Sequence, residues 1–285
     1  MNVSKLPIGI FDSGVGGLTV YRALHNRLPN ERFVYVGDTA RVPYGTKSLA
    51  TVERYAIENS RFLASVGIKL LVVACNTASA LALPKIREKI DVDVVGVIGP
   101  GGRKAVAITS DLANPKIGVI ATEATVSSNA YANAISRASA GAEVFQSACP
   151  LFVPLAEEGW THEAETRSIA AKYLGEMRRF GPHALVLGCT HYPILREVVQ
   201  QTVGENVMLI DSGEATAEEV EGLLISKGLG NPDGVPGDRS LCDDLDHFYV
   251  TDAAERFARV AERFLGAQPS KLEAIEVYGG DELKG

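Results

Sequence analysis

The chain has 285 residues, of which 46% are hydrophobic and 22% charged, a balance typical of a globular protein with a sizeable buried core. Its net charge of −7 and the scatter of its basic residues among acidic ones argue against nucleic acid as a partner. The N-terminus lacks the apolar core of a signal peptide, and no later stretch is long and apolar enough to cross a membrane, so we expect a cytoplasmic protein without a membrane partner.

Short apolar runs alternate with segments of helical period in the first part of the chain. The runs Ile8–Phe11, Phe33–Val36 and Leu70–Ala74 are predicted as buried strands, and Leu18–Leu28 and Thr51–Val66 as the helices between them. Strands that alternate with helices are typical of a parallel sheet with crossover connections. The pattern therefore predicts an α/β fold.

A second set of strands follows, at Ile117–Ile120, Glu143–Gln146 and Ala184–Leu187. This set repeats features of the first in the same order and at nearly constant spacing. The repeated features are Ile8-Gly9-Ile10 with Ile117-Gly118-Val119, Val42-Pro43 with Val153-Pro154, and Cys75 with Cys189. Such repetition predicts two related, pseudo-symmetric α/β halves.

Segments rich in glycine and proline indicate where the halves meet. The strand near Val95 runs into Gly99–Gly102, which we predict as a turn between domains. We predict an exposed loop over Asn231–Asp246, followed by a strand and a helix at Phe248–Leu265 that pack back onto the first half. The expected division is residues 1–98 with 213–268 as the first domain, 99–212 as the second, and 269–285 as a C-terminal tail.

Two cysteines come directly after corresponding strands, Cys75 in the first half and Cys189 in the second. Ligands of open parallel sheets bind beyond the carboxyl ends of the strands. If these ends face each other, one cleft between the domains holds both thiols on opposite sides of a ligand. We therefore predict the active site in that cleft.

Two opposed thiols suit a reaction that inverts a carbon centre. One thiolate removes a proton from one face and one thiol returns a proton to the other face. A thiol's ordinary pKa of about 8.5 allows both forms near neutral pH when neighbouring groups tune it. The four cysteines lack the spacing of a zinc site or a disulfide framework, and we expect Cys149 and Cys242 to be structural thiols.

Four segments of the chain closely resemble the glutamate racemases of the cofactor-independent aspartate/glutamate racemase superfamily. These segments are Gly9–Gly17, Val42–Gly45, Ala74–Ala78 and Gly188–Pro193. The resemblance implies interconversion of L- and D-glutamate, the D-isomer being a building block of bacterial peptidoglycan. It implies no pyridoxal phosphate, no other cofactor and no metal, and it suggests a homodimer.

The resemblance also assigns roles to individual residues. It implies catalytic roles for Cys75, Cys189, Asp12, Asp38, Glu157 and His191. It implies substrate contacts for Asp12, Ser13, Tyr44, Gly45, Asn76, Thr77, Thr190 and His191. It suggests that Cys75 takes the proton from D-glutamate and Cys189 from L-glutamate. From the residues themselves, the backbone N–H groups at the helix starts after both cysteines are expected to hold a carboxylate.

Several alternatives remain at this stage. The substrate could be aspartate or another amino acid, because a side-chain pocket is not legible in the sequence. Cys189 with His191 could form a cysteine hydrolase, although we expect residues two apart not to point together. A binding protein without turnover is a third interpretation. Asp38, Glu157 and His191 could also be ordinary surface or capping groups.

Overall fold

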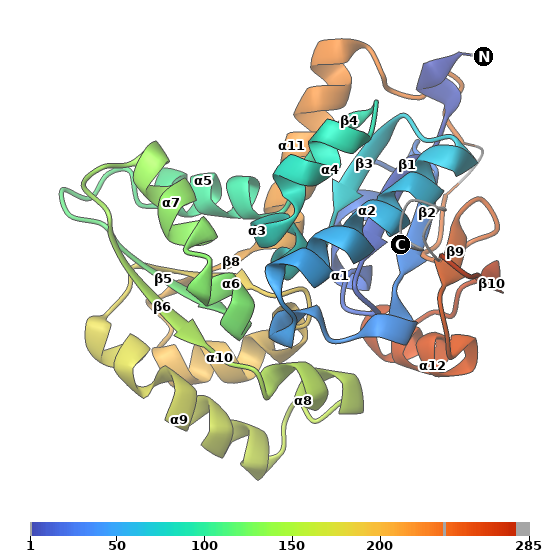
Figure 1. The fold of residues 1–285 in the computed structure, drawn as a ribbon. Helices are drawn as coiled ribbons and strands as arrows, with labels where there is room; N and C mark the ends of the chain where they lie inside the picture. The colour runs from blue at the N-terminus through green and yellow to red at the C-terminus, as the bar shows by residue number, and fades with distance from the viewer. Residues whose placement is uncertain (1, 236–237, 278–285) are drawn as a thin grey trace.

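The computed structural model describes residues 2–235 and 238–277 and contains two parallel β-sheets (Figure 1). The first sheet has the strand order β10-β9-β2-β1-β3-β4. Its strands are β1 (Ile8–Asp12), β2 (Phe33–Gly37), β3 (Leu70–Val73), β4 (Asp93–Gly96), β9 (His247–Val250) and β10 (Leu272–Ala274). All neighbouring strands pair in parallel. The strand and helix predicted at Phe248–Leu265 thus return to the first half.

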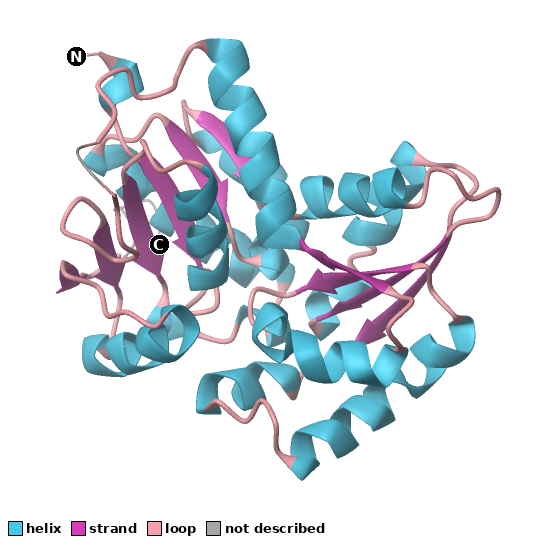
Figure 2. Cartoon of the chain, turned by 180° about the vertical axis from the view of Figure 1, so that it is seen from behind, coloured by secondary structure: helices cyan, strands magenta, loops and turns pink. Residues whose placement is uncertain are grey.

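The second sheet repeats the central part of the first. Its order is β6-β5-β7-β8, which corresponds to β2-β1-β3-β4. Its strands are β5 (Lys116–Ala121), β6 (Glu143–Ala148), β7 (Ala184–Gly188) and β8 (Met208–Asp211). Seen from behind, the two sheets form separate layers that are joined by helices (Figure 2). The prediction of two pseudo-symmetric α/β halves is confirmed.

Helices cover both faces of each sheet (Figure 1). In the first half these helices are α1 (Leu18–Arg27), α2 (Leu49–Val66), α3 (Asn76–Leu81), α4 (Leu83–Lys89), α11 (Ser212–Lys227) and α12 (Ala254–Leu265). In the second half they are α5 (Ile98–Ile108), α6 (Glu123–Ser127), α7 (Ala130–Ala138), α8 (Phe152–Glu158), α9 (Ala164–Phe180) and α10 (Arg196–Val203). Short 3₁₀ turns are η1 (Val3–Lys5), η2 (Thr39–Arg41), η3 (Tyr44–Thr46) and η4 (Tyr192–Leu195).

Local sequence explains where these elements begin and end. Strands β1, β2 and β7 are buried along their whole length, as expected for apolar runs covered on both faces. Helix α2 begins where the Ser48 side chain accepts a hydrogen bond from the Thr51 N–H. It ends at Gly67, whose φ of 89° suits glycine.

The turn predicted at Gly99–Gly102 is wrong, because these residues form the first part of α5. Pro100 lies in the opening turn, where its missing N–H breaks no helical hydrogen bond. A Cβ at Gly101 would lie 3.0 Å from Ser212 Oγ, and one at Gly102 would lie 3.2 Å from Ala134 Cβ. The glycines therefore let α5 pack closely on α11 and α7.

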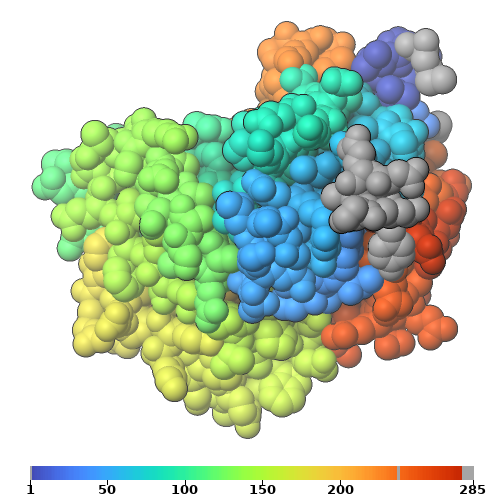
Figure 3. Space-filling model, viewed as in Figure 1, coloured from blue at the N-terminus to red at the C-terminus, as the bar shows by residue number. Residues whose placement is uncertain are grey.

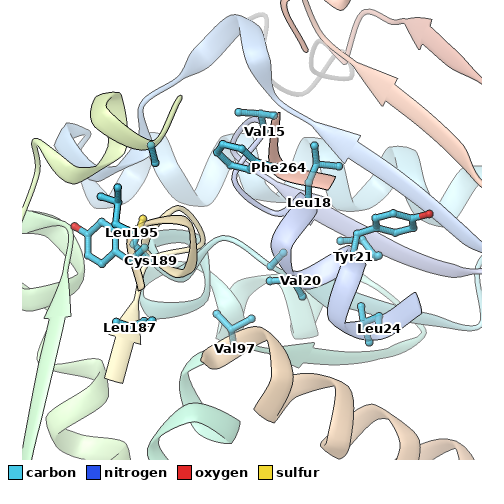
Figure 4. Packing of buried hydrophobic residues seen from close by; sticks show 14 of the residues in the cluster. Val15, Leu18, Val20, Tyr21, Leu24, Val97, Leu187, Cys189, Leu195 and Phe264 are labelled. Atoms are coloured by element: carbon cyan, nitrogen blue, oxygen red, sulfur yellow. The ribbon is translucent and has the colours of Figure 1, made fainter. Parts of the chain in front are cut away.

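One hydrophobic cluster runs through both halves (Figure 4). It includes Leu18 of α1, Val97 between β4 and α5, and Leu187 and Leu195 of the second half. Cys189 belongs to the same cluster and is 6% exposed. Since close packing fixes side-chain positions, this shared core holds Cys189 at the border between the halves.

The segment Asn231–Asp246 has no helix or strand in its described part, as predicted, but it is not exposed throughout. Arg239 pairs with the buried Asp246 at 2.7 Å, and Asp246 accepts a hydrogen bond of 2.8 Å from the Tyr21 hydroxyl. The prediction of an exposed loop is therefore wrong for Arg239 and Asp246, which pack against the first half. Beyond it, β10 occupies a sheet edge where a tail was expected, and residues 278–285 of that tail lie outside the described part.

No helix in the described part of the chain combines the length and apolar character that crossing a membrane requires.

Candidate active site

A cavity of about 60 Å³ lies between the two halves and contains both cysteines that follow equivalent strands. On the face drawn in Figure 3, atoms of the N-terminal part and of the second half meet without a wide opening. The residues that line the cavity are Ser13, Gly14, Val42, Pro43, Tyr44, Gly45, Cys75, Asn76, Thr77, Thr122, Val153, Glu157, Cys189, Thr190 and His191. The site is thus built from the loops and short helices that follow β1, β2 and β3 and β5, β6 and β7.

Cys75 lies between β3 and α3 and acts as the N-cap of that helix. Its Sγ accepts a hydrogen bond of 3.4 Å from the Ala78 N–H. Burial and the nearby charge of Asp12 raise the pKa of Cys75 to about 12, against the opposing effect of the Ser13 hydroxyl and the Ala78 N–H. In the ligand-free protein Cys75 is therefore a neutral thiol.

Cys189 has a different partner. Its Sγ lies 3.8 Å from His191 Nδ1, and His191 Nε2 lies 3.0 Å from Glu157 Oε1. Burial lowers the pKa of His191, but the hydrogen bonds and charges of Cys189 and Glu157 outweigh it and raise this pKa to about 10. At neutral pH the ring is therefore positive, and it lies beside the Cys189 sulfur.

The expectation that Cys189 and His191 would not point together is wrong. The chain leaves β7 in a turn and enters η4 at Tyr192, so the residues follow no straight helix. The turn brings the imidazole back to the sulfur. A cysteine, a histidine and a carboxylate consequently stand in series, an arrangement that cysteine hydrolases also use.

Asp12 is fully buried at the end of β1 and does not line the cavity. Its Oδ2 accepts a hydrogen bond of 2.9 Å from the Gly14 N–H, while its Oδ1 has no partner among the described residues. Burial raises the pKa of Asp12, against the charge of His191 and the neighbouring backbone N–H groups. Its Oδ1 is therefore free to accept a hydrogen bond from a ligand or a thiol.

Asp38 also lies behind the cavity wall, where its carboxylate is fully engaged. It accepts hydrogen bonds from Arg41, from Asn59 at 3.1 Å, from Thr251 at 3.0 Å and from the Tyr44 hydroxyl. Among these partners Tyr44 lines the cavity. The contact of Asp38 with the site thus runs through Tyr44.

Asn76 begins α3 and is 2% exposed. Its Nδ2 donates a hydrogen bond of 2.8 Å to the Tyr131 hydroxyl on α7. Its Oδ1 has no partner among the described residues. The amide therefore offers an acceptor at the site, whereas the backbone N–H groups at the start of α3 are donors.

Threonine hydroxyls join the two halves beside Asn76. Thr77 Oγ1 lies 3.0 Å from Thr122 Oγ1 and 3.3 Å from Thr125 Oγ1. A Cβ at Gly45 would lie 2.9 Å from Thr122 Cβ, so the loop after β2 touches the same threonine. Thr190 is tied to the first half, since its carbonyl accepts a hydrogen bond of 2.8 Å from Thr19 Oγ1.

The loop after β1 approaches the second half closely at Gly16. A Cβ there would lie 2.3 Å from Thr190 Oγ1 and 2.4 Å from His191 Cε1. Only glycine avoids this overlap. The Gly14–Gly17 segment is thus a packing turn at the site.

Comparison with known proteins identifies the family. Residues 8–220 match the family described as Asp/Glu/Hydantoin racemase. Over 275 residues the chain is 51% identical to the glutamate racemase of Geobacter metallireducens, covering 96% of this chain and 98% of that protein. The chain belongs to the glutamate racemases.

Solved racemase structures have the same fold. A glutamate racemase isoform from Bacillus anthracis matches with a TM-score of 0.86 at 35% identity, covering 96% of this chain and 98% of that one. The glutamate racemase of Francisella tularensis in complex with D-glutamate matches with a TM-score of 0.86 at 38% identity and the same coverage. This member of the racemase family therefore has the family's architecture along nearly its whole length.

Most of the residues predicted for this racemase's site meet at the cavity. The predicted residues that line it are Ser13, Tyr44, Gly45, Cys75, Asn76, Thr77, Glu157, Cys189, Thr190 and His191, whereas Asp12 and Asp38 lie behind the wall. The wall also contains Gly14, of the glycine turn after β1, and Val42, Pro43 and Val153, of the two Val-Pro pairs that the sequence places at strand ends, whereas Thr122 was missed. The internal repeat could have indicated Thr122, which follows β5 as Ser13 follows β1.

Proposed function

We propose that this glutamate racemase interconverts L- and D-glutamate with Cys75 and Cys189 as the two proton-transfer groups. The observation that carries the proposal is the placement of both thiols in one cavity, each after an equivalent strand of a pseudo-symmetric half. The thiols differ in their surroundings, which suits a pair in which one is charged and the other neutral.

The proposed reaction is balanced in both directions. The thiolate of one cysteine takes the α-proton and becomes a thiol, and the electron pair of the C–H bond remains on the substrate. The other cysteine then gives its proton to the opposite face and becomes a thiolate. With L-glutamate Cys189 is the base and Cys75 the acid, and with D-glutamate the roles exchange.

The two cysteines have different charged neighbours in the ligand-free protein. His191, whose pKa is raised to about 10, supplies a positive charge beside Cys189, whereas burial and the charge of Asp12 hold Cys75 as a neutral thiol.

The carbanion-like transition state also needs stabilisation. Backbone N–H groups at the start of α3, the hydroxyls of Thr77 and Thr122, and Thr190 are the donors that we assign to the substrate carboxylates. Displacement of water by the bound substrate would strengthen such hydrogen bonds. Asp12, which lies behind the wall, is assigned to tuning Cys75.

The resemblance to the family supports three further proposals. D-glutamate from this reaction would enter peptidoglycan synthesis in the cytoplasm, the reaction would need no cofactor, and the protein would act as a homodimer. Light scattering on the eluting peak of a sizing column would test the dimer.

The direct test follows circular dichroism of L-glutamate and of D-glutamate with purified, metal-free and pyridoxal-free protein. Proton NMR in deuterated water is recorded alongside. We expect optical activity to vanish from both sides while deuterium appears at the α-carbon. If aspartate loses its optical activity and glutamate does not, the proposed substrate changes from glutamate to aspartate.

Variants at the two cysteines test the mechanism. Cys75→Ser and Cys189→Ser should each abolish racemisation, since a serine hydroxyl is too weak an acid to replace a thiol. Each should retain some one-sided chemistry on one enantiomer. Unimpaired racemisation by either variant would overturn the two-cysteine mechanism.

The series Cys189–His191–Glu157 is the observation that favours a hydrolase as second candidate. A hydrolase would form an acyl-enzyme on Cys189 and would not need Cys75. Mass spectrometry after incubation with activated esters would detect such an adduct. We expect no acyl-enzyme that forms on Cys189 and is then hydrolysed.

A further inference from the structure

A buried chain of hydrogen bonds connects the helix after Cys75 with the strand before Cys189. Asn76 Nδ2 donates to the Tyr131 hydroxyl at 2.8 Å, this hydroxyl lies 2.7 Å from Ser212 Oγ, and Ser212 Oγ donates to the Leu187 carbonyl at 3.1 Å. Asn76 belongs to the first half, Tyr131 to the second, and Ser212 to the first turn of α11. No group in this chain is a known part of the proposed proton transfer.

The last member fixes the direction of the whole chain. The Leu187 carbonyl can only accept, so the Ser212 hydroxyl must donate to it. Ser212 Oγ then accepts from the Tyr131 hydroxyl, whose oxygen in turn accepts from an N–H donor. Only the Nδ2 side of Asn76 can provide that donor. The amide of Asn76 therefore has a defined orientation in which Oδ1 is left for another partner.

The fold makes room for this chain. Tyr131 is fully buried and Ser212 is 4% exposed. A Cβ at Gly188 would lie 2.9 Å from Tyr131 Cε2, and one at Gly101 would lie 3.0 Å from Ser212 Oγ. Two glycines thus accommodate the ring and the hydroxyl, one of them directly before Cys189.

The free end of the chain lies at the site. Asn76 lines the cavity, and its buried Oδ1 has no partner among the described residues. An unpaired buried acceptor is unfavourable, so a ligand donor is the natural partner. Of the groups on an amino acid at neutral pH, only the ammonium is a donor.

We propose that Tyr131 and Ser212 are positioning residues that turn the Asn76 amide so that Oδ1 accepts a hydrogen bond from the substrate ammonium. The proposal deepens the racemase function and rests on it. Tyr131 and Ser212 touch neither substrate nor proton, and they act through Asn76 alone. Their effect is therefore on recognition of the amino group and not on the thiols.

Removing the serine hydroxyl reverses the polarity of the chain. In Ser212→Ala the Tyr131 hydroxyl loses its acceptor, and Asn76 Oδ1 becomes the acceptor within reach. The amide then rotates and presents Nδ2 to the cavity, where it repels the ammonium. In Tyr131→Phe the amide loses its partner altogether and is free to take either orientation.

The experiment compares a ligand with the ammonium and a ligand without it. D-glutamate and glutarate, which differ by the amino group, are titrated against the full-length protein, with glutarate measured as a competitive inhibitor. For Ser212→Ala we expect about a tenfold rise in KM for both glutamate enantiomers, an inhibition constant for glutarate changed by less than twofold, and kcat reduced far less than KM rises. Tyr131→Phe should show the same pattern with a smaller rise in KM.

Ser60→Ala is the matched control. Ser60 is buried, donates to the Ala56 carbonyl at 2.7 Å on α2, and is not among the residues that line the cavity. We expect Ser60→Ala to change the stability of the protein but to affect the binding of glutamate and of glutarate equally. If Ser212→Ala weakens glutarate and glutamate equally, the chain is merely structural and the proposal is overturned. If the unaltered protein fails to racemise glutamate, the proposed function has failed instead.

Discussion

Asp38 shows how a residue outside the cavity can act on it. Its carboxylate holds the Tyr44 hydroxyl and Arg41, and Arg41 also pairs with Glu58. In Asp38→Asn an N–H₂ group replaces one acceptor, so the Tyr44 ring in the cavity wall loses its anchor. We expect kcat to fall about tenfold, equivalent to about 1.4 kcal/mol, with a smaller change in KM.

Glu58→Gln provides the control for Asp38→Asn. Glu58 shares the Arg41 guanidinium, and in the described part of the chain it forms no hydrogen bond with Tyr44. The Glu58→Gln variant should have a lower melting temperature, while its kcat stays within twofold of that of the unaltered protein. Equal losses of kcat in both variants would assign the effect to Arg41 and remove Asp38 from the site.

The charge of His191 gives a prediction about pH. Burial lowers the pKa of this ring, and the hydrogen bonds and charges of Cys189 and Glu157 raise it to about 10. The raised value means that the imidazolium, and the stability it contributes, is present at neutral pH and lost as pH rises through about 10. Glu157→Gln removes one of the charges that raise the pKa.

In Glu157→Gln the pKa of His191 should therefore fall, and the alkaline loss of kcat/KM with L-glutamate should move to lower pH. A pH–rate profile and the NMR titration of the His191 ring measure this shift. Glu158→Gln, at the exposed neighbouring residue, should leave both unchanged. An unshifted profile in Glu157→Gln would show that Glu157 does not tune His191.

At the scale of elements, α12 reaches from the first half to α8 of the second. Arg256 lies 3.2 Å from Glu157 Oε2, and Arg263 donates to the Glu157 carbonyl at 2.6 Å. Arg256 has a side chain that is 59% exposed. Because water and salt screen such a pair, its contribution is small, about 0–1 kcal/mol.

Arg256→Gln should therefore lower kcat/KM by at most about fivefold. The difference between the variant and the unaltered protein should disappear at about 1 M salt, because the kcat/KM of the unaltered protein then falls to that of the variant. Arg259→Gln on the same exposed face of α12 is the control and should have no effect at any salt concentration. A large, salt-independent loss in Arg256→Gln would mean that α12 fixes the geometry of α8.

The elements that were predictable from sequence are those with a local cause. Apolar runs such as Leu70–Val73 identify buried strands, and the position of Cys75 and Cys189 after equivalent strands places both at one edge. The helical start of α5 was not predictable, because its glycines serve packing against α11 and α7 and not a turn.

Two other differences have causes that composition and residue spacing do not record. Asp246 is buried because Tyr21 and the Phe33 N–H reach it from far along the chain. The approach of His191 to Cys189 is local, but it depends on how the chain turns out of β7.

At the scale of the whole molecule, several bonds join the halves across the site. Thr19 donates to the Thr190 carbonyl, Asn76 to Tyr131, and Thr77 lies against Thr122. The cavity they enclose, about 60 Å³, is far smaller than the 300–1,000 Å³ or so of typical ligand pockets. We therefore expect the halves to move apart to admit glutamate and to close again around it.

This closure is measurable in Cys75→Ser, where D-glutamate binds without turnover. Ligand at about a hundred times its dissociation constant stabilises the folded state by about 2.7 kcal/mol, which corresponds to a rise of roughly 5 °C in melting temperature. Hydrogen exchange should slow in both walls, at Gly14–Gly17 of the first half and at Thr190–Tyr192 of the second, because closure restores the bonds that cross the cleft. Protection confined to one wall would mean that glutamate binds to one half alone, and racemisation between two opposed thiols would then require a different closed state.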